Sequence, residues 1–178
     1  MFKDRLERVA LFGGSFDPPH FGHKLVVSEA LKSLDIDRLL VVPTFLNPFK
    51  TDSHYTPNER FLLSIEMFNT FKSVYVERFE IDQGEATPTA KTVKHFQKKY
   101  SVDYIIIGAD NLNSIERWYN FKWLNSEVTW VIASRAGYKM TSNKLRDFII
   151  LDVDADISST QIRNQEKTDN KGKFIEWI

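Results

Sequence analysis

The chain has 178 residues, of which 42% are hydrophobic and 27% charged, so we expect one globular domain over residues 1–178. Its 24 basic and 24 acidic residues cancel, which argues against an extended nucleic-acid-binding or membrane-binding surface. The lack of cysteine excludes disulfides, thiolate catalysis and cysteine-ligated zinc. No signal-peptide core or membrane-spanning segment is recognisable, so we expect a cytoplasmic protein.

The first elements alternate between strand and helix patterns. Residues 9–12 are apolar and stop at two glycines, as expected of a buried strand. Residues 22–34 carry apolar side chains at helical spacing and predict a helix. Residues 38–42 predict a second strand, which Pro43 ends, and a polar loop follows over residues 44–55.

The start of the next helix is marked by its capping residues. Thr56 is a favourable N-cap, a proline follows at the first helical position, and Glu59 completes a capping box. We expect the buried face of this helix to consist of Phe61, Ile65 and Phe68.

The second half of the chain continues the alternation. The expected strands are residues 74–81, 102–107, 127–133 and 148–153. The expected helices pass through Ala90, Val93 and Phe96, cover residues 115–124, and begin again at 158, in a C-terminal segment of about 158–178 that packs on the domain. Because strands alternate with helices and are apolar on both faces, we expect an α/β fold with a doubly wound, mostly parallel sheet.

Ligands of such sheets bind beyond the carboxyl ends of the strands. The segments expected at that edge are residues 13–23, 44–50, 108–110 and 157–163. Their glycines and helix starts offer backbone N–H groups to a phosphate. Lys50 and Arg163 add positive charge, and His20 and His23 add hydrogen-bond donors. The pattern predicts a phosphate-binding site.

Considered one by one, these residues leave other interpretations open. Gly13 and Gly14 fit any tight turn, and they do not form the GxGxxG pattern of dinucleotide-binding oxidoreductases. His20 and His23 have the spacing of a metal-binding pair, but they lack the glutamate of HExxH and an evident third ligand. Asp17 fits a simple turn-capping role.

Two motifs together resemble one enzyme superfamily. GGSFDPPHFGH, residues 13–23, resembles the first signature of the HxGH nucleotidyltransferases, and ISSTQIR, residues 157–163, resembles the second. The segments TPTAKTVK, IIIGADNLNSIERWYNF and WVIASRAGY are similar to segments of the bacterial nicotinate-nucleotide adenylyltransferases. The resemblance covers about residues 9–163 and implies a Rossmann-like nucleotidyltransferase fold. Phe49 stands where that family usually has a histidine, whereas the following Lys50 matches.

The resemblance implies an enzyme of NAD biosynthesis. Such an enzyme transfers the adenylyl group of ATP to nicotinate mononucleotide and releases nicotinate adenine dinucleotide (deamido-NAD) and pyrophosphate. The attacking phosphate is already an anion, so catalysis would consist of positioning and of stabilising negative charge. Mg²⁺ would be carried with ATP, and no protein ligand for it is assigned. The expected partners are ATP and nicotinate mononucleotide, and the protein would be a monomer or a homo-oligomer.

The resemblance also assigns residues to the site. The implied catalytic residues are His20, His23, Lys50 and Arg163. The implied ATP-binding residues are Gly13, Gly14, Ser15, Phe16, His20, His23, Gly108, Asp110, Ser159, Thr160 and Arg163. The implied nicotinate mononucleotide-binding residues are Thr89, Trp118 and Tyr119. The alternatives are a sister enzyme such as a pantetheine-phosphate adenylyltransferase, and a catalytically silent nucleotide-binding regulator.

Overall fold

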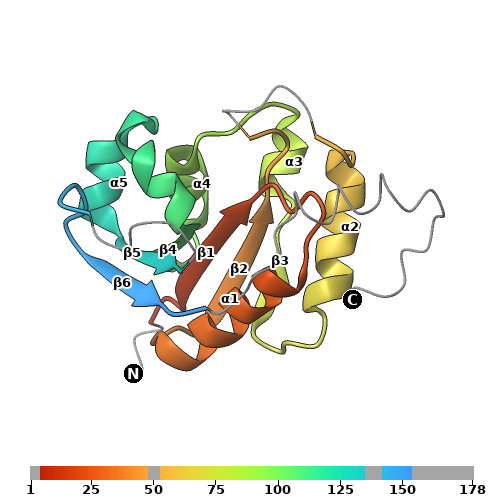
Figure 1. The fold of residues 1–178 in the computed structure, drawn as a ribbon, viewed down its shortest axis with the longest axis horizontal. Helices are drawn as coiled ribbons and strands as arrows, with labels where there is room; N and C mark the ends of the chain where they lie inside the picture. The colour runs from red at the N-terminus through yellow and green to blue at the C-terminus, as the bar shows by residue number, and fades with distance from the viewer. Residues whose placement is uncertain (1–4, 48–52, 135–141, 154–178) are drawn as a thin grey trace.

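The computed structural model describes residues 5–47, 53–134 and 142–153 (Figure 1). Its six strands are β1 (Arg8–Gly14), β2 (Arg38–Pro43), β3 (Val74–Val76), β4 (Ser101–Gly108), β5 (Thr129–Ala133) and β6 (Phe148–Leu151). They form one sheet in the order β3-β2-β1-β4-β5-β6, and every neighbouring pair is parallel. The α-helices are α1 (Phe21–Ser33), α2 (Pro57–Phe68), α3 (Phe79–Gln83), α4 (Thr89–Phe96) and α5 (Phe121–Glu127). The expected doubly wound parallel sheet is thus confirmed.

Helices cover both faces of this sheet. Val9 and Leu11 of β1 belong to a hydrophobic cluster with residues of α4 and α5. Ala10 and Phe12 belong to a second cluster with residues of α1 and α2. Figure 1 accordingly shows α4 and α5 gathered at the upper left, with α1 below and α2 at the right. Because both faces are buried, the strand sequences are continuously apolar rather than alternating.

The capping signature at residue 56 is confirmed. The Thr56 N–H donates to the Glu59 carboxylate at 2.8 Å, and the Glu59 N–H donates to Thr56 Oγ1 at 3.3 Å. Pro57 occupies the first turn of α2, where its missing N–H costs no helical hydrogen bond. The local signals therefore fix where this helix begins.

The buried face of α2 differs from the expected one. Ile65 is 41% exposed and Phe61 only partly buried, whereas Phe68 is buried as expected. The residues of α2 that are buried are Arg60, Ser64, Met67 and Phe68. The buried face is rotated relative to the expected one because the Arg60 guanidinium donates hydrogen bonds to backbone carbonyls in the interior. An assignment by hydrophobicity alone would place this arginine at the surface.

The strand expected over residues 74–81 is wrong beyond Val76. β3 stops there, and α3 follows. Arg78 pairs with Asp82 one helical turn later at 2.7 Å. Gly84 ends α3 with a φ of 69°, in the left-handed conformation that glycine adopts without strain. These local interactions favour a helical turn over the partly alternating strand pattern.

The helix expected over residues 115–124 is interrupted. Residues Ile115–Arg117 form a short 3-10 turn, and α5 begins only at Phe121. Asn120 has a φ of 57°, and this left-handed conformation separates the two pieces. The break places Trp118 and Tyr119 in a connection rather than inside a helix.

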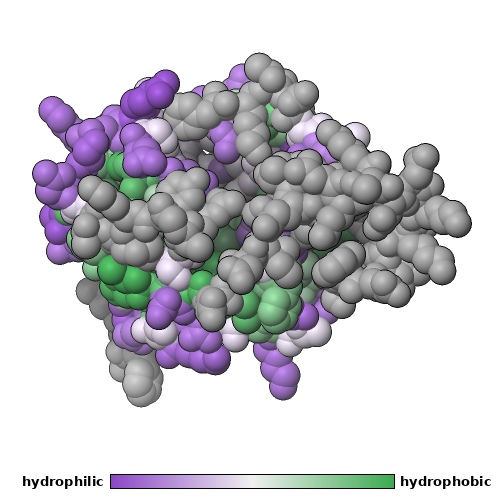
Figure 2. All heavy atoms as spheres, in the orientation of Figure 1, coloured by the Kyte–Doolittle hydropathy of each residue, from purple (hydrophilic) through white to green (hydrophobic). Residues whose placement is uncertain are grey.

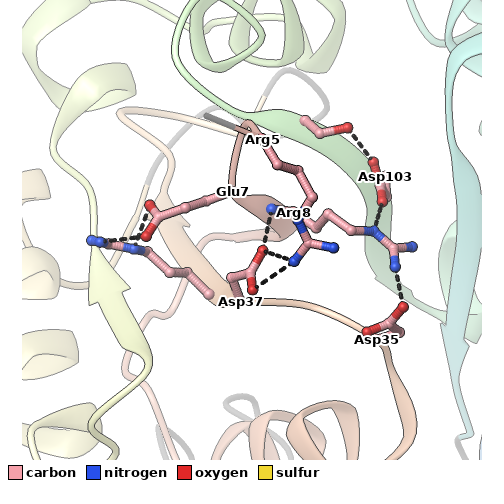
Figure 3. Close-up of polar contacts among 8 residues, drawn as sticks. Arg5, Glu7, Arg8, Asp35, Asp37 and Asp103 are labelled. Carbon is pink, nitrogen blue, oxygen red and sulfur yellow. Dashed lines mark hydrogen bonds and ion pairs between the residues drawn. The ribbon is translucent and has the colours of Figure 1, made fainter. Parts of the chain in front are cut away.

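A network of ion pairs lies at the amino ends of β1, β2 and β4 (Figure 3). Arg8 pairs with Asp35 and Asp103, and Arg5 donates to both oxygens of Asp37 at 3.1 Å. The hydrogen bond to Asp103, followed by the charges of Asp103 and Asp35, raises the pKa of the Arg8 guanidinium. The network links chain segments far apart in sequence, at the edge of the sheet opposite the carboxyl ends of the strands.

The visible surface is mixed. Figure 2 shows hydrophilic side chains over the helices at the upper left and hydrophobic ones over β6, where Ile150 is exposed. Within the described ranges no helix has both the length and the apolar character needed to cross a bilayer. The C-terminal segment expected over residues 158–178 lies outside the described residues.

Candidate functional site

A cavity of about 680 Å³ opens at the carboxyl ends of β1 and β4. The strand order reverses between these two strands, and ligands of doubly wound sheets bind at this switch point. Of the residues implied by the resemblance, those that line the cavity are Gly13, Gly14, Ser15, Phe16, His20, His23, Thr89, Gly108, Asp110, Trp118 and Tyr119. Segments almost a hundred residues apart in the chain thus meet at one site.

Four further residues implied by the resemblance fall outside the described ranges. They are Lys50, Ser159, Thr160 and Arg163. Their placement in the site remains a prediction.

His20 and His23 form a reciprocal cap on the first turn of α1. The Gly22 N–H donates to His20 Nδ1, and the His20 N–H donates to His23 Nδ1, both at 3.1 Å. A ring nitrogen that accepts a hydrogen bond carries no proton, so each neutral imidazole has its proton on Nε2. The ring centroids lie 3.8 Å apart, at the positive end of the α1 dipole. The pair therefore offers N–H donors suited to an anion.

The loop that carries these histidines has an unusual backbone conformation at Phe16. Its φ is 46°, a conformation that few residues other than glycine adopt. The Phe16 ring is buried against Phe12 at 5.3 Å, His23 at 4.8 Å and Phe68 at 6.2 Å between centroids. The sequence assigned Gly13 and Gly14 to a tight turn, but the positive φ in this loop belongs to Phe16, which aromatic packing holds in place.

Asp17 ties this loop to the chain before α2. Its carboxylate accepts hydrogen bonds from the backbone N–H groups of His54 and Tyr55, both at 2.8 Å. Asp17 is buried, and these charge-assisted bonds compensate for its desolvation. Asp17 does more than cap its own turn, because its two partners lie 37 and 38 positions further along the chain.

Arg60 holds the same two segments together through further hydrogen bonds. Its guanidinium donates to the Ser15 and Phe45 carbonyls at 2.6 Å and to the Tyr55 carbonyl at 3.2 Å. The residue is 1% exposed, and burial lowers the pKa of its guanidinium while the charge of Asp17 opposes this shift. No sequence signal points to this role of Arg60, since an arginine in a helix is usually at the surface.

The end of β4 brings Gly108 and Asp110 together. A Cβ at Gly108 would lie only 2.5 Å from an Asp110 carboxylate oxygen, so the position requires glycine for close approach rather than for its φ. Asn111 Nδ2 donates to the Gly108 carbonyl at 3.2 Å and stabilises the turn. The Asp110 carboxylate is therefore held against the backbone at the cavity wall.

Thr89, Trp118 and Tyr119 form another part of the wall. Thr89 begins α4, and the Trp118 indole packs edge-on against Trp130 at 5.9 Å between centroids. Trp118 Nε1 is a buried donor that has no hydrogen-bond partner among the described residues. Tyr119 is largely exposed. This wall combines an aromatic surface with polar groups that a ligand could satisfy.

The cavity is also lined by polar residues to which no sequence motif assigned an individual role. They include Thr44, Asn47, Glu80, Thr87, Thr92 and Asn111. Glu80 is the least expected of them, because an acidic residue is rarely buried without a charged partner. Within residues 5–47, 53–134 and 142–153, no group of three or more acidic or histidine side chains is arranged to hold a metal ion.

Comparisons with known proteins agree with this geometry. The cytidylyltransferase-like family model matches residues 11–165. A probable nicotinate-nucleotide adenylyltransferase of Sulfurovum sp. (strain NBC37-1) is 46% identical over 93% of this chain and 89% of the relative. The probable nicotinate-nucleotide adenylyltransferase of Aliarcobacter butzleri (strain RM4018) is 42% identical over 90% of this chain and 88% of the relative. The fold matches Plasmodium falciparum nicotinic acid mononucleotide adenylyltransferase complexed with NaAD, with a TM-score of 0.72 and 22% identity over 89% of this chain and 83% of that one. The chain therefore belongs to the cytidylyltransferase-like family, among the nicotinate-nucleotide adenylyltransferases.

Proposed function

We propose that the protein transfers the adenylyl group of ATP to nicotinate mononucleotide, giving nicotinate adenine dinucleotide and pyrophosphate. One observation carries this proposal. A single cavity joins the paired imidazoles at the start of α1 to the wall formed by Thr89 and Trp118. The first part suits a triphosphate, and the second suits a flat ring with a polar substituent. The names of the relatives support the same assignment.

The reaction needs no activated protein nucleophile. A phosphate oxygen of nicotinate mononucleotide attacks the α-phosphorus of ATP, and the bond from that phosphorus to the bridging oxygen of the β-phosphate breaks. Pyrophosphate leaves in line with the electrons of that bond. Because both reactants are anions, the protein must hold them close and offset the repulsion between them.

His20 and His23 would supply part of that compensation. Their fixed tautomers make Nε2–H donors, and the cap holds both rings before any ligand arrives. Such preorganised donors stabilise charge that develops in the transition state without reorganising during the step. We assign His20 to the α- and β-phosphates and His23 to the neighbouring phosphate and ribose.

The rest of ATP would lie between two further groups of residues. Gly108 and Asp110 would contact adenine through the backbone and the ribose hydroxyls through the carboxylate. We assign Lys50 to the β/γ end of the triphosphate. The residues assigned to the β- and γ-phosphates from the second signature are Ser159, Thr160 and Arg163.

Mg²⁺ fits this site as an ion carried by the nucleotide. The polar lining includes the imidazoles of His20 and His23 and several hydroxyl groups, which suit phosphate oxygens, and the carboxylate of Asp110. Mg²⁺ commonly binds substrate phosphates and water and only one or two protein carboxylates. When bound, it would neutralise part of the triphosphate charge, while the protein residues orient the phosphates.

Pyrophosphate release tests the assignment. We expect release from ATP with nicotinate mononucleotide, at least about a hundredfold lower kcat/KM with the nicotinamide form, and none with phosphopantetheine. Two charge-assisted hydrogen bonds to the ring carboxylate, at roughly 1.5–3 kcal/mol each, account for that preference. ATP binding without pyrophosphate release would instead indicate a regulator, and turnover of phosphopantetheine a sister enzyme.

Thr89→Val refines the test of the nicotinate wall. This change removes the hydroxyl and keeps the shape, so the preference for nicotinate should fall. Thr70→Val, at an exposed position after α2, is the matched control and should leave the preference unchanged. An unaltered preference in Thr89→Val would remove Thr89 from the site.

A further inference from the structure

Glu80 is a buried carboxyl group that the reaction described above does not use. It lies on α3, lines the cavity and is 4% exposed. The Thr92 hydroxyl donates to its Oε1 at 2.6 Å, whereas Oε2 is buried and has no partner among the described residues. Burial raises the pKa of Glu80 to about 7, although the hydrogen bond from Thr92 acts in the opposite direction.

The position of Glu80 relates it to the nicotinate wall. Its partner Thr92 lies one helical turn after Thr89 on α4, so the two threonines share a face of that helix. Among the residues that line the cavity, those that follow Glu80 most closely in the sequence are Thr87, Pro88, Thr89 and Thr92. Glu80 therefore belongs to the end of the cavity that, on the proposed function, receives the nicotinate ring and its carboxylate.

Most charged side chains around α3 have partners other than Glu80. On α3 itself, Asp82 pairs with Arg78 at the surface. On α4, Lys91 lies 4.0 Å from Glu85, and the Lys94 ammonium lies over the Trp123 ring. The remaining charged or titratable residues of these and the adjoining elements are Glu77 after β3, His95 stacked on Phe79, and Arg38 of β2, which pairs with Glu7 and lies over the Tyr75 ring of β3. The other titratable residues of the cavity lining are Asp17, His20, His23, Asp110, Arg117 and Tyr119.

An ionised Glu80 would oppose a substrate carboxylate. It would place a buried negative charge, with one unpartnered oxygen, in the wall that the second carboxylate must approach. A neutral carboxylic acid has no such repulsion, and it gains an O–H donor. We propose that Glu80 is a specificity-determining residue that acts as a neutral acid, so that the carboxylate-bearing mononucleotide binds the protonated protein. Proton uptake by Glu80 then accompanies binding at pH values where the empty protein has released that proton.

The pH dependence of KM for nicotinate mononucleotide tests this. If only the protonated form binds, KM in the wild type rises roughly 20-fold between pH 6.5 and 8.5. Glu80→Gln keeps the shape and an acceptor for Thr92 and carries no charge, so its KM should rise far less. The substrate phosphate, with a second pKa of about 6, titrates identically against both proteins and cancels in the comparison. KM for ATP is the internal control and should give the same profile in both.

A second variant guards against a purely structural effect of Glu80→Gln. Thr92→Val removes the hydrogen bond that stabilises the ionised carboxylate, so the rise in KM should move to higher pH. Identical KM profiles in wild type and Glu80→Gln, or an unmoved profile in Thr92→Val, would overturn the role of Glu80. Lack of pyrophosphate release at pH 6.5 with wild type would instead overturn the proposed function, and the inference with it.

Discussion

On the proposed function, His20 combines a structural and a chemical role in one imidazole. Nδ1 accepts the Gly22 N–H and caps α1, and the Nε2–H would donate to phosphate. An alanine at this position would remove both roles together, and its effect on activity would be ambiguous. Asparagine can still cap the helix, because its side-chain oxygen accepts the same kind of hydrogen bond.

We predict that His20→Asn separates the two roles. Its free energy of unfolding should stay within about 1 kcal/mol of wild type, since the cap is retained. Its kcat for pyrophosphate release should fall on the order of 10²–10³, which is typical of losing one preorganised donor. Urea unfolding and steady-state kinetics measure the two quantities. Near wild-type turnover would exclude His20 from the reacting phosphates.

Gly108 gives a second prediction at this scale. In Gly108→Ala the new Cβ meets the Asp110 carboxylate, the movable end of a side chain, so the fold should survive while Asp110 shifts. Loss of a charge-assisted hydrogen bond would raise KM for ATP roughly 10- to 100-fold. Asp110→Ala should do the same, and the double variant should be no worse than Asp110→Ala alone. Additive losses would show that Gly108 acts independently of Asp110.

Individual site residues were predictable where a motif carried them. The glycines and histidines of residues 13–23 belong to such a motif, and the structure brings them to one cavity. Arg60, on an expected helix, and Glu80, in an expected strand, were not predictable as buried residues, because hydrophobicity assigns charged side chains to the surface. Their burial depends on partners remote in the chain, the Ser15 and Phe45 carbonyls and the Thr92 hydroxyl.

At the scale of elements, α2 positions the loop that precedes α1. Arg60 reaches from α2 to the Ser15 carbonyl, and Asp17 reaches back to the residues before α2. The two contacts run in opposite directions between the same segments. They form a brace that fixes the histidine-bearing loop against the chain leading into α2.

We predict that Arg60→Met weakens both folding and activity. The substitution leaves buried carbonyl groups without their hydrogen-bond donor. Each carbonyl that finds no other partner lowers the free energy of unfolding by about 1–3 kcal/mol, and the loop before His20 is held less firmly. Both the midpoint of urea unfolding and kcat should fall. Arg5→Met is the matched control, because the Arg5–Asp37 pair lies at the surface at the opposite end of the sheet, and such pairs contribute about 1 kcal/mol or less. Equal effects of the two substitutions would argue against the brace.

Most elements were predictable because their signals are local. β2 contains the apolar run of residues 39–42 and β4 that of residues 104–107, and α2 begins at its capping box. The errors at residues 77–81 and 115–124 have a different cause. There the backbone is decided by Gly84 and Asn120 in left-handed conformations and by the ion pair of Arg78 with Asp82, which outweigh weak periodicity.

At the scale of the whole molecule, the two ends of the sheet have different tasks. The amino ends of β1, β2 and β4 carry ion pairs that link Arg5 and Arg8 to Asp35, Asp37 and Asp103. The carboxyl ends of the same strands surround the cavity. Ion pairs between charged side chains thus hold the amino ends of these strands, whereas backbone groups and polar side chains face a ligand at their carboxyl ends.

The buried Glu80 should also affect the stability of the whole molecule. The native protein keeps the Glu80 proton up to a pKa of about 7, whereas the unfolded chain releases it near 4.5. Between these values the native state binds more protons, so this group's contribution to the free energy of unfolding falls as pH rises. Relative to wild type, Glu80→Gln should gain about 2–3 kcal/mol between pH 5 and pH 8. Urea unfolding at both pH values measures this difference, and the exposed control Glu66→Gln should follow the wild type. Parallel pH dependences of wild type and Glu80→Gln would mean that the native protein does not retain this proton.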